Sequence, residues 1–86
     1  MDFIPIIKAV PVTLSVAVDT SDYNEKGISG VMFYAACTVT LSDGTNTIDI
    51  ELTAYQPLRL PANCTSITSD TTTTMIRGQF DQPEYT

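Results

Sequence analysis

Apolar and polar residues alternate along three stretches of this chain, and each stretch is long enough for a strand. The stretches are VTLSVAV at residues 12–18, CTVTLS at 37–42 and TIDIELTA at 47–54. Successive side chains of a strand point to opposite faces of its sheet, so each stretch predicts a strand with one buried and one solvated face. In the first stretch, the predicted buried face consists of Val12, Leu14, Val16 and Val18.

The second and third stretches are joined by SDGTN at residues 42–46. Asp43 and Gly44 supply the positive-φ position that a hairpin turn needs. We therefore predict a β-hairpin over residues 36–54 and place it at the centre of the fold. Helix formation is poorly supported, because the chain contains fourteen threonines, which favour the pleated surface of a sheet.

Three further segments complete the predicted secondary structure. VMFYAAC at residues 31–37 could be a buried strand or a short helix, and its length favours a strand that leads into the hairpin. YQPLRLPANC at 55–64 contains two prolines, which confine it to a sheet edge or a connection. TTTTMIRGQF at 71–80 carries Met75, Ile76 and Phe80, which favours a terminal strand over the alternative of a disordered threonine-rich linker.

The two predicted faces of that terminal strand differ in composition. Thr74, Ile76, Gly78 and Phe80 share one face; the other holds Thr73, Met75, Arg77 and Gln79. Taken together, the runs predict an all-β fold, a small antiparallel sandwich or barrel of about six to seven strands.

The chain of 86 residues is long enough for one domain. We divide it into an extended N-terminal arm at residues 1–11, a single β domain at 12–80 and a short C-terminal tail at 81–86. Pro5 and Pro11 disfavour a helix in the arm. Its apolar side chains would form an interaction site if they stayed in water, and the alternative is an arm folded back on its own sheet.

Charge limits the partners that we expect. Ten acidic and four basic residues give a net charge of -6, whereas nucleic acid and anionic membrane surfaces require clustered cations. No apolar run approaches the roughly 20 residues of a membrane span, and the N-terminus lacks the pattern of a signal peptide. We therefore expect synthesis in the cytoplasm, with Cys37 and Cys64 as buried thiols; a disulfide between them is the alternative.

The chain contains no histidine, so Ser/His and Cys/His nucleophile pairs are excluded, and we expect neither enzymatic activity nor a cofactor. From Asp22, the loop VDTSDYNEKG at 18–27 resembles the start of a calcium loop. However, Lys26 occupies a ligand position, and Phe33 stands where the bidentate glutamate belongs. We therefore expect its polar side chains to cap turns, with Tyr23 packed over the loop, and we expect no metal site.

The candidate partner-binding residues come from the arm and from two arginines. Each arginine interrupts an otherwise apolar or neutral segment, and arginine is enriched at protein interfaces. The alternative is an arginine stem that lies over apolar surface with its head in water. The candidate set is Phe3, Ile4, Ile6, Ile7, Arg59 and Arg77.

Two stretches resemble segments of small structural proteins of tailed bacteriophages. One is VAVDTSDYNEKGISG at residues 16–30, with a strand, Asp-Thr-Ser-x-Tyr, a turn and a glycine-bearing segment. The other, at 41–80, has a hairpin, a Leu/Pro/Arg connection and a threonine-rich final strand. NEKGISG replaces the more usual Ala-x-Gly-Asp after Tyr23, and Ser69-Asp70 replaces a glycine before the threonines.

The resemblance implies a virion component of the head, made in the host cytoplasm. The most specific function that the resemblance implies is that of a decoration or cement protein, which binds the major capsid protein and its own copies as a homo-oligomer. It implies no catalytic residue. The alternative function, from another class, is a cytoplasmic binding module that docks a peptide on an exposed sheet edge.

Overall fold

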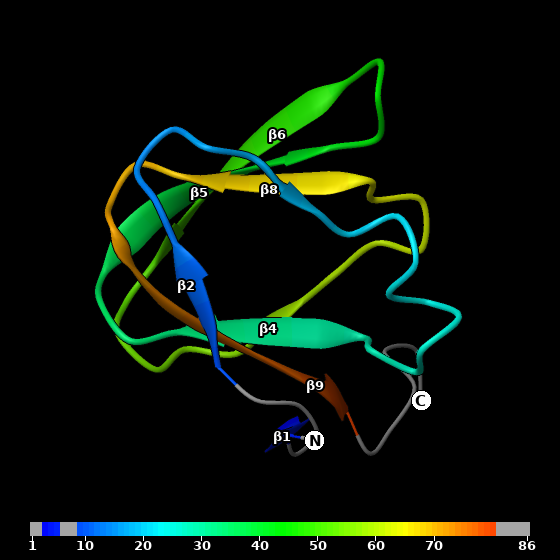
Figure 1. Cartoon of the computed structure of the whole chain (residues 1–86), viewed down its shortest axis with the longest axis horizontal. Helices are drawn as coiled ribbons and strands as arrows, with labels where there is room; N and C mark the ends of the chain where they lie inside the picture. The colour runs from blue at the N-terminus through cyan, green and yellow to red at the C-terminus, as the bar shows by residue number, and fades with distance from the viewer. Residues whose placement is uncertain (1–2, 6–8, 81–86) are drawn as a thin grey trace.

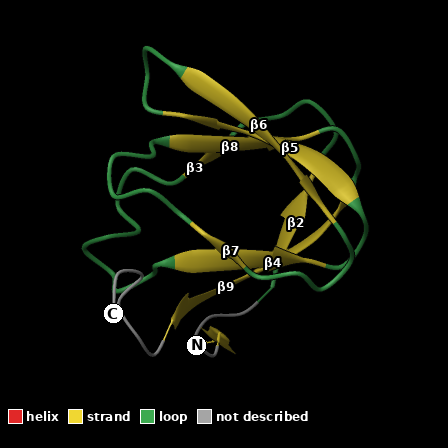
Figure 2. Cartoon of the chain, turned by 180° about the vertical axis from the view of Figure 1, so that it is seen from behind, coloured by secondary structure: helices red, strands yellow, loops and turns green. Residues whose placement is uncertain are grey.

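The computed structural model describes residues 3–5 and 9–80, which form two antiparallel sheets and no helix (Figure 2). The sheets pack face to face as a β-sandwich (Figure 1), which confirms the predicted all-β class. The described residues form nine strands, more than the six or seven expected: β1 (Phe3–Pro5), β2 (Val10–Val12), β3 (Val18–Asp19), β4 (Gly30–Phe33), β5 (Cys37–Ser42), β6 (Thr47–Leu52), β7 (Leu58–Arg59), β8 (Ser66–Ser69) and β9 (Thr73–Phe80).

We call the two sheets A and B. Sheet A has the order β1-β9-β4-β7, and β2 also pairs with β9. Sheet B has the order β3-β8-β5-β6. Strands that are neighbours in sequence often lie in different sheets, so the chain repeatedly crosses from one layer to the other.

The predicted hairpin is confirmed as β5 and β6, which pair from Cys37↔Leu52 to Ser42↔Thr47. At its tip, the Asp43 carboxylate accepts the N–H groups of Thr45 and Asn46, and Gly44 adopts a φ of 97°. This is the positive-φ turn expected from the Asp-Gly pair. The hairpin is not central, however, because β6 forms an edge of sheet B.

The prediction of one continuous strand over residues 12–18 is wrong. Val12 ends β2 in sheet A, and Val18 begins β3 in sheet B. Between them the chain turns at Ser15, which has a φ of 63° and donates its N–H to the Ser69 carbonyl. Leu14 and Val16 lie in this crossing and are 50% and 54% exposed rather than buried. The apolar alternation continues through the turn, so it could not reveal the break.

The predicted terminal strand is confirmed as β9, which begins at Thr73 and pairs with β1, β2 and β4. The segment at 31–37 supplies β4, a strand as favoured, and the chain then crosses into sheet B. The proline-containing segment at 55–64 supplies β7, which lies at an edge of sheet A as its prolines require.

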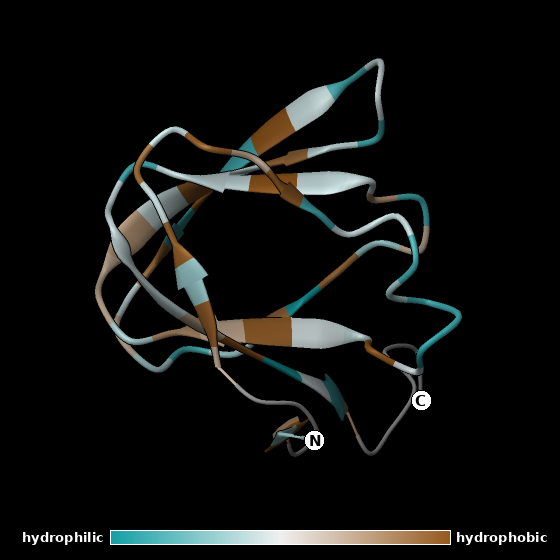
Figure 3. Ribbon diagram, viewed as in Figure 1, coloured by the Kyte–Doolittle hydropathy of each residue, from teal (hydrophilic) through white to brown (hydrophobic). Residues whose placement is uncertain are grey.

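The core lies between the sheets and uses the alternate residues of their strands. Met75 of β9 pairs with Phe33 of β4, and the two side chains are 0% and 1% exposed. Val39 and Ile67 fill the opposing side from sheet B. Figure 3 shows the apolar positions recurring along both layers. Burial of each such side chain stabilises the fold by about 1.5–3 kcal/mol before ordering costs.

The described part of the N-terminal arm lies on its own sheet. β1 pairs with residues 78–80 of β9, and β2 pairs with residues 73–75 of the same strand. This arrangement matches the alternative in which the arm folds back. Residues 6–8 and the tail at 81–86 lie outside the described residues.

Candidate protein-binding surfaces

On the outer face of sheet A, the phenyl rings of Phe3 and Phe80 and the guanidinium group of Arg59 lie over two glycines. Gly30 of β4 and Gly78 of β9 are direct partners in the ladder. The rings of Phe3 and Phe80 meet edge to face over them, with centroids 5.5 Å apart at 65°. The Arg59 guanidinium lies 4.4 Å from the centroid of the Phe80 ring. We call Phe3, Phe80 and Arg59 the aromatic–arginine stack.

The glycines are what permit this stack. A Cβ at Gly30 would collide with the Phe80 ring, and one at Gly78 would collide with the Ile4 carbonyl and lie 2.8 Å from Phe3 Cζ. Aromatic side chains commonly cover glycines in this way in sheets. The side chains of the stack therefore come from β1, β7 and β9, and the glycines beneath them from β4 and β9.

The structure brings only part of the predicted partner-binding set together. Phe3 and Arg59 meet through Phe80, whereas Ile4 pairs with Gln79 and projects to the opposite face of β1, with 42% of its surface exposed. Arg77 pairs with the buried Val31 and lies on the core-facing side of β9, away from the stack. Ile6 and Ile7 are outside the described residues.

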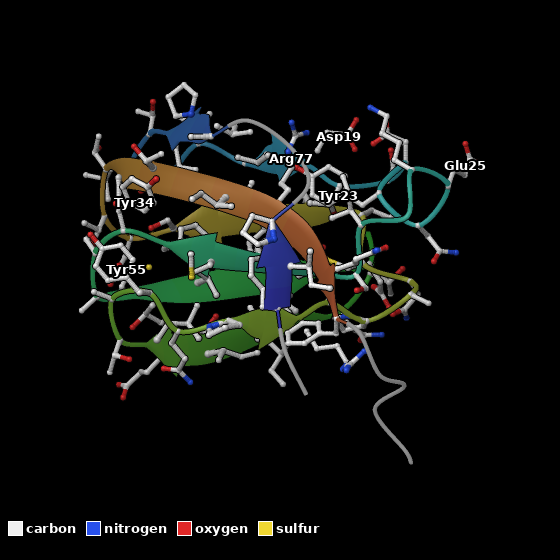
Figure 4. The ribbon with its side chains drawn as sticks, turned by 90° about the horizontal axis from the view of Figure 1, so that it is seen from below. Asp19, Tyr23, Glu25, Tyr34, Tyr55 and Arg77 are labelled. Carbon is white, nitrogen blue, oxygen red and sulfur yellow. The ribbon has the colours of Figure 1, made fainter. Side chains whose placement is uncertain are left out.

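Arg77 instead packs on Tyr23, and its Cζ lies 5.6 Å from the ring centroid (Figure 4). The Nε atom of Arg77 is buried and has no hydrogen-bond partner among the described residues. Tyr23 itself is 4% exposed, and this burial raises the pKa of its phenol, although the guanidinium opposes the shift. Tyr23 thus belongs to the core between the sheets.

The acidic loop at residues 18–27 is held by local bonds. The Asp19 carboxylate accepts the Ser21 N–H at 2.9 Å, which lowers the pKa of Asp19. Lys26 Nζ lies 2.9 Å from Asp22 Oδ2, so an ammonium group binds the carboxylate that would begin a calcium loop. Within residues 3–5 and 9–80, no group of three or more His, Cys, Asp or Glu side chains could hold a metal ion.

Within residues 3–5 and 9–80, β6 pairs on one side only, with β5, and sequence analysis did not identify this free edge. It has six residues, whereas the other edge strands, β1, β2, β3 and β7, have only two or three. Unpaired edges of this kind are sites of strand addition. Alternation predicts the strand, but its edge position depends on the order of strands in the sheet, which no local pattern contains.

The hydrogen bonds at the hairpin tip establish which backbone groups of β6 face outwards. Asp43 donates its N–H to the Asn46 carbonyl, so these two residues form a hydrogen-bonded pair. One position along, the Ser42 carbonyl accepts from Thr65, on the side of β8. Bonded and non-bonded pairs alternate in an antiparallel ladder. The backbone groups that point away from β5 are therefore those of Thr47, Asp49 and Glu51.

The core-facing side chains of β6 become more exposed to solvent toward the hairpin tip. Leu52 is 5% exposed, but Ile48, on the same face, is 57% exposed. In Figure 1, β6 rises away from sheet A toward its turn. A cleft of about 170 Å³ lies here, between the hairpin and the loop that contains Pro61 and Cys64, and Leu41 and Ile48 line it. We call it the Ile48 cleft.

The outer face of sheet B carries acidic charge. Asp49 and Glu51 project from β6, and Thr40 Oγ1 donates to Asp49 Oδ1 at 2.8 Å. Asp70 lies at the end of β8, where it accepts the Thr38 N–H and has a lowered pKa. The four strands of sheet B contain no lysine or arginine.

A tyrosine pair marks one end of the sandwich. The rings of Tyr34 and Tyr55 lie 5.5 Å apart, and the residues are 43% and 60% exposed (Figure 4). Tyr55 adopts a φ of 61°, which is uncommon for a bulky residue, and donates its N–H to the Phe33 carbonyl.

Both cysteines are free and buried, as expected. Burial raises the pKa of the Cys37 thiol, whereas Cys64 donates through its thiol to the Ser66 carbonyl at 3.3 Å.

The described residues thus form a small antiparallel β-sandwich. Three hollows that they line have volumes of about 140, 170 and 260 Å³, each below the roughly 300–1,000 Å³ of small-molecule sites. In the described part of the chain, no helix is long and apolar enough to cross a membrane. The chain matches no family model, and no curated protein or solved structure is significantly similar to it.

Proposed function

We propose that this chain is a structural subunit that assembles onto a larger protein particle, most specifically a decoration or cement protein of a tailed-bacteriophage head. The observation that carries the assembly role is the apolar surface of the sandwich. The large apolar residues that are 42–60% exposed are Ile4, Leu14, Val16, Tyr34, Ile48 and Tyr55. Among them, the rings of Tyr34 and Tyr55 are in contact, and contiguous exposed apolar surface marks protein-binding sites. The assignment to a phage head rests on the resemblance of residues 16–30 and 41–80.

In this proposal the partners are the major capsid protein and further copies of the chain, and the chain resides in the virion. The proposed capsid contact is the β1 margin of sheet A, where the aromatic–arginine stack covers the outer face and Ile4 projects from the other face of β1. Arginine and aromatic side chains are enriched at protein interfaces, and the stack holds one arginine and two phenylalanine rings in contact.

Co-sedimentation with capsids tests this proposal. The recombinant chain is mixed with capsids assembled from the major capsid protein of the same genome, and pelleted copies are counted. An Ile4→Ser variant should lose binding. Leu14→Ser is the matched control, because Leu14 is similarly exposed but bonds to Thr72, beyond the opposite end of β9. If the unmodified chain fails to pellet, the decoration role is wrong; if both variants pellet, Ile4 is not in the contact.

The alternative is a binding module that docks an extended peptide on a sheet edge, and the free edge of β6 favours it. Stoichiometry separates the two functions. A decoration protein occurs in many copies on one particle, whereas a docking module forms a small soluble complex, which light scattering after size exclusion would detect.

A further inference from the structure

The free edge of β6 and the Ile48 cleft lie on the same strand. Outward-facing N–H and C=O groups of Thr47, Asp49 and Glu51 offer a ladder to one more strand. Side chains of an added strand alternate between the two faces of sheet B. Those on the inner face would lie beside Ile48, over the cleft of about 170 Å³, which suits one apolar side chain.

The outer face sets the charge of that strand. Its outward side chains would lie beside Asp49 and Glu51, directly opposite or diagonal to them. Opposite charges at such positions stabilise a sheet, and like charges destabilise it. Among the described cations, Arg59 and Arg77 belong to sheet A and Lys26 to the loop after β3, so none lies on a strand of sheet B.

We propose that β6 accepts an extended segment of another protein in which apolar residues alternate with lysine or arginine. The apolar residues face Ile48 and the cleft, and the basic residues face Asp49 and Glu51. This deepens the proposed function by naming the chemistry of one partner segment. A second copy of the chain is a poor occupant, because antiparallel pairing of two β6 strands about Ile50 places Asp49 opposite Glu51 twice.

Amide exchange measured by NMR tests the proposal directly. The probe is a hexapeptide of alternating lysine and valine, capped at both ends, and the control peptide has glutamate in place of lysine. In the free chain, the outward amides of Thr47, Asp49 and Glu51 should exchange quickly with water, while those of Ile48 and Ile50 should be protected by their bonds to β5. The lysine peptide should slow the three outward amides selectively. It should also bind at least tenfold more tightly than the glutamate peptide.

Two sets of variants test separately how charge and apolar contact contribute to peptide binding. Asp49→Asn with Glu51→Gln should weaken the lysine peptide about tenfold at low salt and abolish its advantage over the glutamate peptide. Asp22→Asn with Glu25→Gln is the matched control. It removes the same charge from the loop after β3, which β8 and β5 separate from β6, and it should leave binding unchanged.

Ile48→Thr tests the apolar face. It keeps a β-branched residue and should weaken binding several-fold without loss of the fold, because Ile48 is already 57% exposed. Circular dichroism of each variant checks that the sandwich is intact.

The proposal is overturned if the outward amides keep their exchange rates in the presence of the lysine peptide, or if both peptides bind equally. Protection of the same amides that rises with protein concentration, without peptide, would assign the edge to a second copy and also overturn it. These results are independent of the capsid experiment, since the edge can bind a peptide whether or not the chain decorates a capsid.

Discussion

Substitution of Gly78 by alanine should detach β1 from the sandwich while leaving the two sheets folded. The new Cβ would collide with the Ile4 carbonyl and lie 2.8 Å from Phe3 Cζ. Both obstacles belong to β1, a three-residue strand at the margin of sheet A. Moving β1 is easier than moving the ladder between β4 and β9, which holds the buried Met75.

The loss of unfolding free energy in Gly78→Ala cannot greatly exceed the stability that β1 contributes. Its edge-to-face ring contact between Phe3 and Phe80 is worth about 0.5–1.5 kcal/mol, and the partial burial of Phe3 adds on the order of 1 kcal/mol. Release of three ordered residues returns conformational entropy and offsets part of this loss. We therefore expect the free energy of unfolding to fall by about 1–2 kcal/mol, which lowers Tm by roughly 5–15 °C in a domain of this size.

Urea unfolding gives the free energy, and NMR gives the location. The nuclear Overhauser contacts between the Phe3 and Phe80 rings should disappear, while the Phe33–Met75 contacts of the core persist. Gln79→Ala is the control, because it shortens an exposed side chain of β9 without adding a Cβ, and it should cost less than about 0.5 kcal/mol. A loss above about 4 kcal/mol would refute the reasoning, since β4 and β9 must then have moved; so would retained ring contacts at full stability.

Three other substitutions or conditions test the core and the turns. Met75→Ala should lower the free energy of urea unfolding by about 2–5 kcal/mol because Met75 is 0% exposed, whereas Ile48→Ala, at 57% exposure, should cost less than about 1 kcal/mol. Backbone N–H groups lower the pKa of Asp43 and of Asp70 below 3.8. The stability from these carboxylates is complete above the unfolded pKa and is lost as pH falls through the folded pKa, so urea midpoints should drop between about pH 4 and pH 2, less steeply in Asp43→Asn. Iodoacetamide should label Cys37 at least tenfold more slowly in the native chain than in urea, because burial raises its pKa; equal rates by peptide mass spectrometry would contradict this.

The elements that sequence analysis predicted correctly are those with a complete local signal. The hairpin of β5 and β6 has alternation on both sides of an Asp-Gly turn, and β9 has apolar residues that a tail would not carry. The continuous strand at 12–18 failed because alternation persists through Ser15, where the chain leaves sheet A for sheet B. The strand ends there because Val12 pairs with Thr73 in sheet A, whereas Val18 pairs with Ile67 in sheet B. Both partners lie far along the sequence, so no local pattern reveals them.

The candidate site residues, like the strands, could be predicted only where the local sequence carries a pattern. Alternation placed Arg77 on the face of Met75 and opposite to Gly78, and the structure has this arrangement. It did not show that the Met75 face is the buried one, so Arg77 was grouped with Phe3 and Arg59, which lie on the other side of the sheet. Phe3 and Arg59 meet over Phe80 only because two glycines from different strands are direct partners, which a single segment cannot reveal.

The carboxylates of β6 affect strand pairing at the free edge in two ways: they oppose pairing with acidic strands and favour pairing with basic ones. An edge strand that alternates isoleucine with neutral residues would pair with its own copies, and charged side chains are a common protection against such pairing. In β6 the protection is selective, because Asp49 and Glu51 oppose an identical or acidic strand but stabilise a basic one by about 0.2–1 kcal/mol for each cross-strand pair. The charge that keeps copies of sheet B apart thus also specifies what the edge can bind. For a chain proposed to assemble in many copies, we therefore expect contacts between copies elsewhere, for example at the Tyr34–Tyr55 end, and we expect β6 to bind a different protein.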